Sequence, residues 1–156
     1  MLTGALVASR SGDRAEAGNF LREAALAADH LDGDGNDRRT AFGPGNVAIH
    51  RVTVAVDLAQ PGEALRAASE VNPKALPGGF LERRATLFVE IARARALRRE
   101  RAEAVASLIE AERVAPEEVR YNAMVYELVR LMLRTERRRH ATPSLASLAH
   151  RLGVLH

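Results

Sequence analysis

Apolar residues recur at helical spacing through most of this chain. Asp13 followed three residues later by Glu16 forms a capping-box pattern, which marks the start of a helix. The apolar positions of that helix are Ala17, Leu21, Ala24 and Ala28. The pattern therefore predicts a short helix that Gly12 ends, and a second helix that runs to about His30.

The next two segments are predicted to be a loop and then a further helix. Leu31–Asp37 is rich in turn-forming residues and has no apolar period, which predicts a loop. Helix is expected again from about Asn46, although the alternating β-branched residues of Val47–Val56 would also allow a strand. The helical spacing of the polar positions and the short Ala-rich helix after Pro61 favour helix.

Prolines and glycines interrupt the pattern between residues 72 and 79. A long helix is expected from about Phe80 to Arg98, followed by a turn. The apolar stripe of the next helix consists of Ala104, Leu108, Ala111 and Ala115.

Two further helices follow. Pro116 ends the preceding helix and is expected to open a new one. The apolar face of that helix would consist of Tyr121, Val125, Leu128 and Met132. Pro143 then introduces a last helix, Ser144–Leu152, which Gly153 stops.

These helices pair into hairpins that align on the small residue near the start of each second helix. Those residues are Ala17, Ala64 and Ala104, at spacings of 47 and 40 residues. A strict tetratricopeptide repeat has about 34 residues, and the excess falls in the loops. The pattern predicts an all-α, tetratricopeptide-like superhelix of stacked antiparallel helical hairpins with a C-terminal capping helix. A generic helical bundle is the alternative.

The prediction treats residues 1–156 as a single domain, with hairpins at about 2–30, 46–71, 80–115 and 116–152. Hydrophobic residues make up 47% of the chain and aromatic residues 4%, a composition that favours helices over sheets. There is no Cys, which excludes disulfides and thiolate chemistry. The formal net charge of +3 does not by itself imply a nucleic-acid partner.

The uncharged stretches are short. Leu2–Ser9 and Ala141–Ala149 fall well below the roughly 20 apolar residues that cross a bilayer. The first nine residues also lack the basic leader of a signal peptide. We therefore expect a cytoplasmic protein that does not contact a membrane.

No catalytic or metal-binding motif is present in the sequence. Asp32, Asp34 and Asn36 begin like a calcium-binding loop, but Asp37 stands where that loop needs Gly. The chain contains neither an HExxH zinc motif nor a nucleophile elbow, phosphate-binding loop or dinucleotide fingerprint. We expect no enzymatic activity, no cofactor and no bound metal.

A polar stripe is the most informative group of candidate functional residues. Asn46, His50, Thr53 and Asp57 share one face of a helix that is otherwise rich in Val and Ala. Forty residues later the first three positions correspond to Thr86, Glu90 and Arg93. In stacked hairpins the first helices line the concave groove, so the two rows would form a binding surface. The alternative is that both rows are solvated faces.

Arginines cluster at residues 93–101 and 134–139, and either cluster could contact phosphate groups. Neighbouring glutamates partly offset both clusters, and no stacking aromatic is interleaved with them. Solvated helix faces are the alternative to direct nucleic-acid binding. The segment Leu145–Val154 looks like the first half of a helix-turn-helix unit, and we interpret it as a capping helix.

Several segments together resemble a known family. They are Thr40–Val52 (TAFGPGNVAIHRV), Gly62–Ala68 (GEALRAA), Glu112–Arg120 (ERVAPEEVR) and Leu148–Gly153 (LAHRLG). They resemble actinobacterial transcriptional regulators in which an Xre-type helix-turn-helix domain is followed by tetratricopeptide-like repeats. The similarity spans nearly the whole chain and concerns the C-terminal repeat region of those regulators.

The resemblance implies a non-catalytic regulatory domain without its own DNA-binding domain. A peptide, small signal or protein would occupy the concave groove and alter hairpin stacking. DNA would be reached only indirectly, through an attached or partner helix-turn-helix domain. The alternative is a constitutive protein-interaction or dimerisation scaffold, for which a homodimer is possible.

Overall fold

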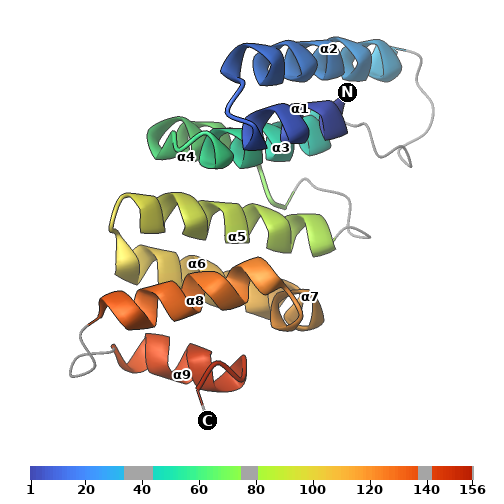
Figure 1. Ribbon diagram of the computed structural model, residues 1–156. Coiled ribbons are helices and arrows are strands. Elements are labelled where there is room, and N and C mark those ends of the chain that lie inside the picture. The colour runs from blue at the N-terminus through green and yellow to red at the C-terminus, as the bar shows by residue number, and fades with distance from the viewer. Residues whose placement is uncertain (34–43, 75–80, 137–141, 156) are drawn as a thin grey trace. The chain divides into compact units, whose positions relative to one another are not determined.

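The computed structural model describes residues 1–33, 44–74, 81–136 and 142–155 (Figure 1). Over these ranges the regular structure is entirely α-helical, which confirms the all-α prediction. The helices are α1 (Leu2–Arg10), α2 (Arg14–Gly33), α3 (Pro44–Asp57), α4 (Pro61–Ser69), α5 (Leu81–Leu97), α6 (Arg101–Val114), α7 (Pro116–Arg120), α8 (Ala123–Thr135) and α9 (Pro143–Arg151).

The chain divides into two compact units, Met1–Pro77 and Gly78–His156. The first contains α1 to α4 and the second α5 to α9. The expectation of one domain over the whole chain stays a prediction.

In the first unit, α1 pairs with α2, α3 pairs with α4, and α3 packs against both α1 and α2. Small residues permit these close approaches: Ala5, Ala8 and Ala17 are buried together with Val54 of α3. Gly4 of α1 lies directly against the ring of Phe20 in α2. The core of this unit is therefore made by alanines and short aliphatic side chains at helix crossings.

In the second unit, α5 and α6 form a hairpin, and α9 packs against both α6 and α8. The core joins apolar side chains from all five helices of this unit. Its largest fully buried members are Leu108, Val119, Val125, Val129, Leu145 and Leu148. The last helix is thus anchored by two leucines that are completely withdrawn from water, as expected for a helix that closes an apolar core.

The turns that close the first three hairpins have one geometry. Gly12, Ala59 and Arg99 all adopt positive φ angles, of 81°, 54° and 64°. Each donates its backbone N–H to the carbonyl three residues back, and the next residue donates to the carbonyl five back, at 2.8 to 3.0 Å. This is the Schellman arrangement of a helix C-terminus. Gly153, after α9, repeats it with φ of 71°.

The positions aligned from the sequence occupy the same place relative to these turns. Ala17, Ala64 and Ala104 each lie five residues after the positive-φ residue, and each is 0% exposed. A residue without side chain beyond Cβ fits where the second helix of a hairpin lies closest to the first. The three hairpins are therefore equivalent at their turns and at the start of their second helices.

The expected helix over the β-branched segment is confirmed, because Pro44–Asp57 forms α3 and no part of that segment is a strand. The prediction that a loop begins at Leu31 is wrong. Helix α2 continues to Gly33. Turn-forming residues such as Asp32 and Gly33 are tolerated in the last turn of a helix. The rest of the expected loop, including Asp34 and Asn36, lies outside the described residues.

The prediction of a single helix after Pro116 is also wrong. The chain forms a short α7, breaks at Tyr121, and begins α8 at Ala123. The break has a local cause: the side chain of Asn122 accepts hydrogen bonds from the backbone N–H groups of Met124 and Val125. Asn122 is therefore the N-cap of a new helix. Tyr121 leaves the predicted apolar face and is 78% exposed, whereas Val125, Leu128 and Met132 are buried as predicted.

Candidate functional site

The polar row of α3 lies beside a buried apolar face of the same helix. Val47, Ile49, Val52, Val54 and Val56 are buried, whereas Asn46, His50, Thr53 and Asp57 are half-buried. Helical periodicity separates the two sets, since the polar residues recur at intervals of three and four. The row is thus neither in the core nor fully in solvent.

Two members of this row are fixed by the helix backbone. The Nδ1 atom of His50 lies 2.9 Å from the carbonyl oxygen of Asn46, and Thr53 donates to the carbonyl of Ile49 at 3.3 Å. Because a carbonyl can only accept, Nδ1 of His50 carries a proton. In the neutral ring the lone pair then resides on Nε2, which can accept a hydrogen bond from a ligand.

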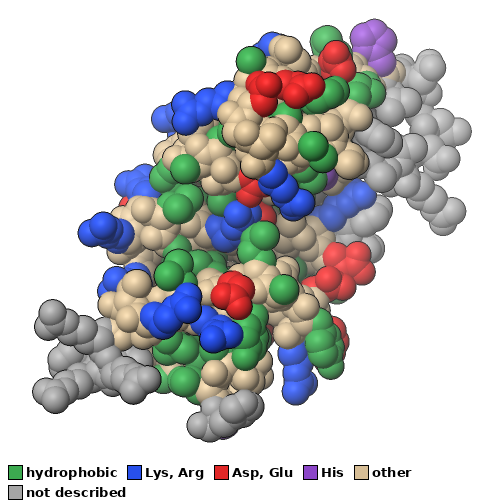
Figure 2. All heavy atoms as spheres, viewed as in Figure 1, with side chains coloured by type: hydrophobic (Ala, Val, Ile, Leu, Met, Phe, Trp, Pro, Cys, Tyr) green, Lys and Arg blue, Asp and Glu red, His purple; other side chains and the backbone are tan. Residues whose placement is uncertain are grey.

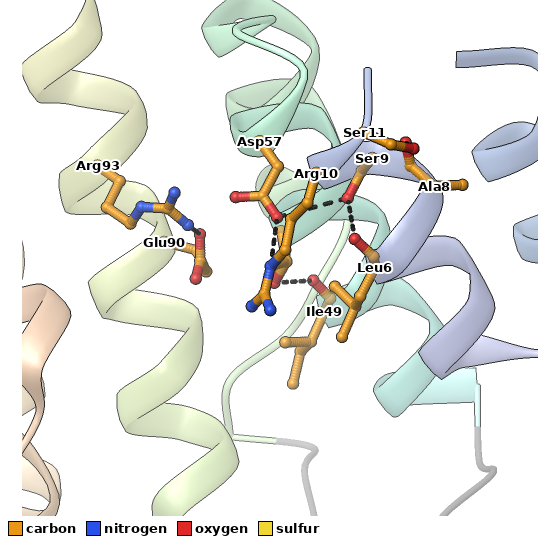
Figure 3. Close-up of polar contacts among 10 residues, drawn as sticks. Leu6, Ala8, Ser9, Arg10, Ser11, Ile49, Asp57, Glu90 and Arg93 are labelled. Atoms are coloured by element: carbon orange, nitrogen blue, oxygen red, sulfur yellow. Dashed lines mark hydrogen bonds and ion pairs between the residues drawn. The ribbon is translucent and has the colours of Figure 1, made fainter. Parts of the chain in front are cut away.

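Asp57, at the C-terminal end of the row, is tied to α1 (Figure 3). One carboxylate oxygen lies 3.4 Å from the hydroxyl of Ser9 and 3.8 Å from Nε of Arg10. Ser9 is buried, and it also contacts the carbonyl of Leu6 at 2.9 Å. The Asp57 side chain is only 9% exposed. It therefore helps to hold α3 against α1, which is a structural role.

The corresponding row of α5 is charged. Arg93 donates from Nη1 to Glu90 at 2.7 Å, and the side chains are 19% and 7% exposed (Figure 3). Thr86 is exposed, and its hydroxyl donates to the carbonyl of Glu82. A carboxylate as buried as that of Glu90 is stable in its charged form only when it is hydrogen-bonded to a cation or other donors, and Arg93 supplies that partner.

Of the seven candidate residues, only Thr86 is exposed to solvent. The other six are half-buried or buried. In the structure His50 contacts the backbone carbonyl of Asn46, and Asp57 contacts Ser9 of α1. Glu90 forms an ion pair with Arg93. The expectation that the α3 and α5 rows line one groove stays a prediction.

Sequence reasoning missed the partners of Asp57. Ser9 and Arg10 are 48 and 47 residues away along the chain, and they belong to a segment that reads simply as the end of a helix before Gly12. A polar residue within the apolar run Leu2–Ser9 was the available signal. Buried polar side chains need a partner, so such a residue points to a contact with another element.

The arginines at 93–101 are largely engaged with carboxylates. Arg95 and Arg98 both contact Glu100 at 2.7 Å, at the turn between α5 and α6. The hydrogen bond from Arg95, and then the charges of Arg98 and Arg95, lower the pKa of Glu100, although partial desolvation acts in the opposite direction. Of the second cluster, Arg134 is exposed, and residues 137–139 lie outside the described residues.

Within the described residues, no three His, Asp or Glu side chains gather closely enough to hold a metal ion. None of the helices in the described parts of the chain combines the length and the apolar character that crossing a bilayer requires. Comparison of the chain with protein-family models, with curated proteins and with solved structures finds no match.

Proposed function

We propose that this chain is a non-catalytic regulatory domain that binds a peptide, a small signal or a protein through the polar rows of its first hairpin helices. The observation that carries the proposal is a shared offset of 40 residues. Asn46, His50 and Thr53 correspond to Thr86, Glu90 and Arg93 at this offset, and so do the hairpin turns at Ala59 and Arg99. The rows therefore stand at equivalent positions in two equivalent hairpins.

Equivalent hairpins are the unit of tetratricopeptide-like stacking, in which first helices form the inner wall of a superhelix. Under this proposal the α3 row offers the polar side chains of Asn46, His50 and Thr53 as hydrogen-bonding groups. The α5 row offers a carboxylate and a guanidinium. A peptide presents amide groups, a carboxylate and an ammonium group, so it matches both kinds of row. A ligand that binds only one arrangement of the hairpins would shift their stacking.

The resemblance to Xre-type actinobacterial regulators adds the biological role to this proposal. The chain would act in the cytoplasm as the sensor region of a regulator. It would influence DNA only through an attached or partner helix-turn-helix domain. Ligand binding would be coupled to DNA binding because the ligand binds one arrangement of the hairpins more tightly than the other.

A displayed library of random peptides, selected against the full chain, tests the proposal. Peptides that bind the wild type are titrated calorimetrically against His50→Ala and Arg93→Ala, which are expected to weaken binding about tenfold, the effect of losing one anchoring side chain. The chain supplies matched controls. His30 contacts the carbonyl of Leu26 as His50 contacts that of Asn46, and Arg113 pairs with Glu110 as Arg93 pairs with Glu90.

His30→Ala and Arg113→Ala are expected to leave peptide affinity unchanged. Equal affinity of all four variants for every selected peptide would contradict the polar rows as the binding surface. Circular dichroism establishes that each variant is folded before it is titrated.

A second candidate function is a constitutive interaction scaffold, which the exposed apolar side chains of Tyr121, Met124 and Leu131 favour. Such residues on a soluble domain often mark a protein contact. Light scattering after size-exclusion chromatography separates the two functions, because a scaffold that acts by self-association is a dimer without any added ligand.

A further inference from the structure

The offset of 40 residues that relates α3 to α5 continues into α8. Buried residues of the three helices are related by it in two sets: Ile49, Val89 and Val129, and Val52, Ala92 and Met132. The helices that follow obey the same offset, since Ala68 of α4, Leu108 of α6 and Leu148 of α9 are also buried. The burial pattern of α8 and α9 therefore repeats that of the two preceding hairpins.

The same offset assigns α8 a row of its own. Thr86, Glu90 and Arg93 of α5 correspond to Tyr126, Arg130 and Leu133, which are called the α8 row below. Tyr126 and Leu133 are half-buried, and Arg130 is exposed. The central carbon of the Arg130 guanidinium lies 5.8 Å from the centre of the Tyr126 ring, which is within reach of a cation–π contact. The α8 row thus combines a cation with an aromatic and an aliphatic surface.

Arg130 differs from Arg93 in how firmly it is paired. Arg93 is hydrogen-bonded to buried Glu90 at 2.7 Å. Within the described parts of the chain, Arg130 has only Glu127 near it, at 3.8 Å, and the two side chains are 50% and 64% exposed. An exposed pair at this distance contributes little, so the guanidinium remains able to bind an anion. In the view of Figure 2, basic, acidic and apolar side chains lie beside one another where α8 runs in Figure 1.

We propose that the α8 row binds a carboxylate of the peptide ligand, with an adjoining apolar part of the peptide against Tyr126 and Leu133. This inference rests on the proposed function and names the group that the ligand must carry. A guanidinium can hold a carboxylate through two parallel hydrogen bonds. In the other rows Arg93 is hydrogen-bonded to Glu90, and Asp57 repels an anion. Arg130 is therefore the cation in the three rows that best suits an anionic group of the ligand.

The α5 and α8 rows belong to one compact unit, and the two helices are in contact there. Figure 1 shows that α5 and α8 run in the same direction. The axes of packed helices lie about 8 to 10 Å apart, and an extended peptide advances about 3.3 Å per residue. The carboxylate is therefore expected about three residues along the peptide from the part that contacts Arg93.

Calorimetric titration of the full chain tests the proposal, with peptides selected from the displayed library. Each peptide is synthesised unchanged, with Asn or Gln in place of its Asp or Glu residues, and with an amidated C-terminus. One of the two altered forms is expected to bind about tenfold more weakly. The form that loses affinity shows whether the carboxylate belongs to a side chain or to the C-terminus.

Variants of the α8 row then locate the contact. Arg130→Gln is expected to weaken binding of the unchanged peptide about tenfold, and to leave binding of the form without the carboxylate unaltered. Arg134→Gln removes the same charge from another exposed position of α8 and is expected to leave both affinities unchanged.

Tyr126→Leu keeps an apolar side chain but removes the ring, and is expected to weaken binding about fivefold. Tyr121→Leu, directly before the N-cap of α8 and outside the row, is its control and is expected to have no effect. Circular dichroism checks that all four variants remain folded.

The results separate this proposal from the proposed function. Peptides that lose affinity for His50→Ala and Arg93→Ala but bind Arg130→Gln as tightly as the wild type would overturn the α8 row and leave the proposed function standing. Equal losses in Arg130→Gln and Arg134→Gln would also overturn it, because the effect would then be one of overall charge. Unchanged affinity in His50→Ala and Arg93→Ala would contradict the proposed function, and this inference with it.

Discussion

Arg151 of α9 holds Glu112 of α6 through two parallel hydrogen bonds, from Nε at 2.9 Å and from Nη2 at 2.7 Å, across 39 residues of sequence. This fork geometry is the strongest form of a surface ion pair. The hydrogen bonds that Arg151 donates to Glu112 raise the pKa of the guanidinium. The pair therefore fastens the last helix at a point outside its apolar contacts.

The first prediction concerns this pair. Glu112→Gln is expected to lower the free energy of unfolding by about 0.5 to 1 kcal/mol, because the side chains are partly exposed and water screens their attraction. Urea denaturation measures the change. Glu110→Gln, which breaks the more exposed Glu110–Arg113 pair within α6, is the matched control and is expected to change stability very little. Equal effects of the two substitutions would contradict a role for Arg151 in fastening α9.

A second prediction concerns the turn after α3. Ala59 adopts a left-handed conformation at φ of 54°, which is unfavourable for any residue with a Cβ atom and favourable for glycine. Ala59→Gly is therefore expected to raise the free energy of unfolding by about 0.5 to 1 kcal/mol. Ala102→Gly, in the first turn of α6, should instead lower it by a similar amount, since glycine is a poor helix former. Thermal denaturation of both variants would show opposite shifts; a loss of stability in Ala59→Gly would contradict the strained turn.

Particular residues show how far the sequence predicts this fold. Capping and apolar periodicity located α2, whose Asp13 side chain accepts the backbone N–H of Glu16 at 2.9 Å, as the capping-box pattern predicts. Ala17, Ala64 and Ala104 were identified as equivalent because a close helix crossing admits only a small side chain. Such local and periodic signals survive in a single sequence, since they depend on neighbours within a few residues.

Other features depend on contacts or conformations that no local pattern encodes. Asp57 is positioned by Ser9 and Arg10 across more than 45 residues, and nothing in the α3 sequence distinguishes it from a solvated carboxylate. The left-handed turns at Ala59 and Arg99 were not expected because neither residue is Gly or Asn. In both turns the left-handed residue and the residue after it donate the two backbone hydrogen bonds that close the helix end.

The contact between Gly4 and Phe20 gives a third prediction. A Cβ atom at residue 4 would lie 3.1 Å from two atoms of the Phe20 ring, closer than ordinary packing allows. Gly4→Ala is therefore expected to lower the free energy of unfolding by about 1 kcal/mol, because the overlap outweighs the gain in helix propensity. Gly62→Ala in α4, where nothing lies within 4 Å, should raise it by up to about 1 kcal/mol. Urea denaturation compares the two, and stabilisation by Gly4→Ala would show that the helices tolerate a wider crossing.

The fourth prediction is a pH dependence at the turn between α5 and α6. Arg95, together with Arg98, holds the pKa of Glu100 below its ordinary value of 4.5. A lowered pKa in the folded state means that the ionised carboxylate stabilises the fold at neutral pH. This contribution is fully present above the unfolded-state pKa and is lost as the pH falls through the lower folded-state pKa.

The variant Glu100→Gln removes that titration. Its melting temperature is expected to fall less steeply than that of the wild type as the pH decreases from about 5 to about 3. Glu103→Gln, in the first turn of the same helix, should retain the steep dependence of the wild type. If Glu100→Gln and the wild type lose stability in parallel over this range, the contacts of Arg95 and Arg98 do not stabilise the folded state.

The fifth prediction tests the boundary that separates α7 from α8. Asn122 caps α8 by accepting from Met124 N at 2.9 Å and Val125 N at 3.3 Å, and Asn122→Ala is expected to lower the free energy of unfolding by about 1 kcal/mol. Gln60 occupies the same position before α4 but makes no side-chain capping hydrogen bond, so Gln60→Ala should be nearly neutral. An Asn122→Ala variant as stable as the wild type would mean that the buried residues of α8, rather than its cap, fix the start of the helix.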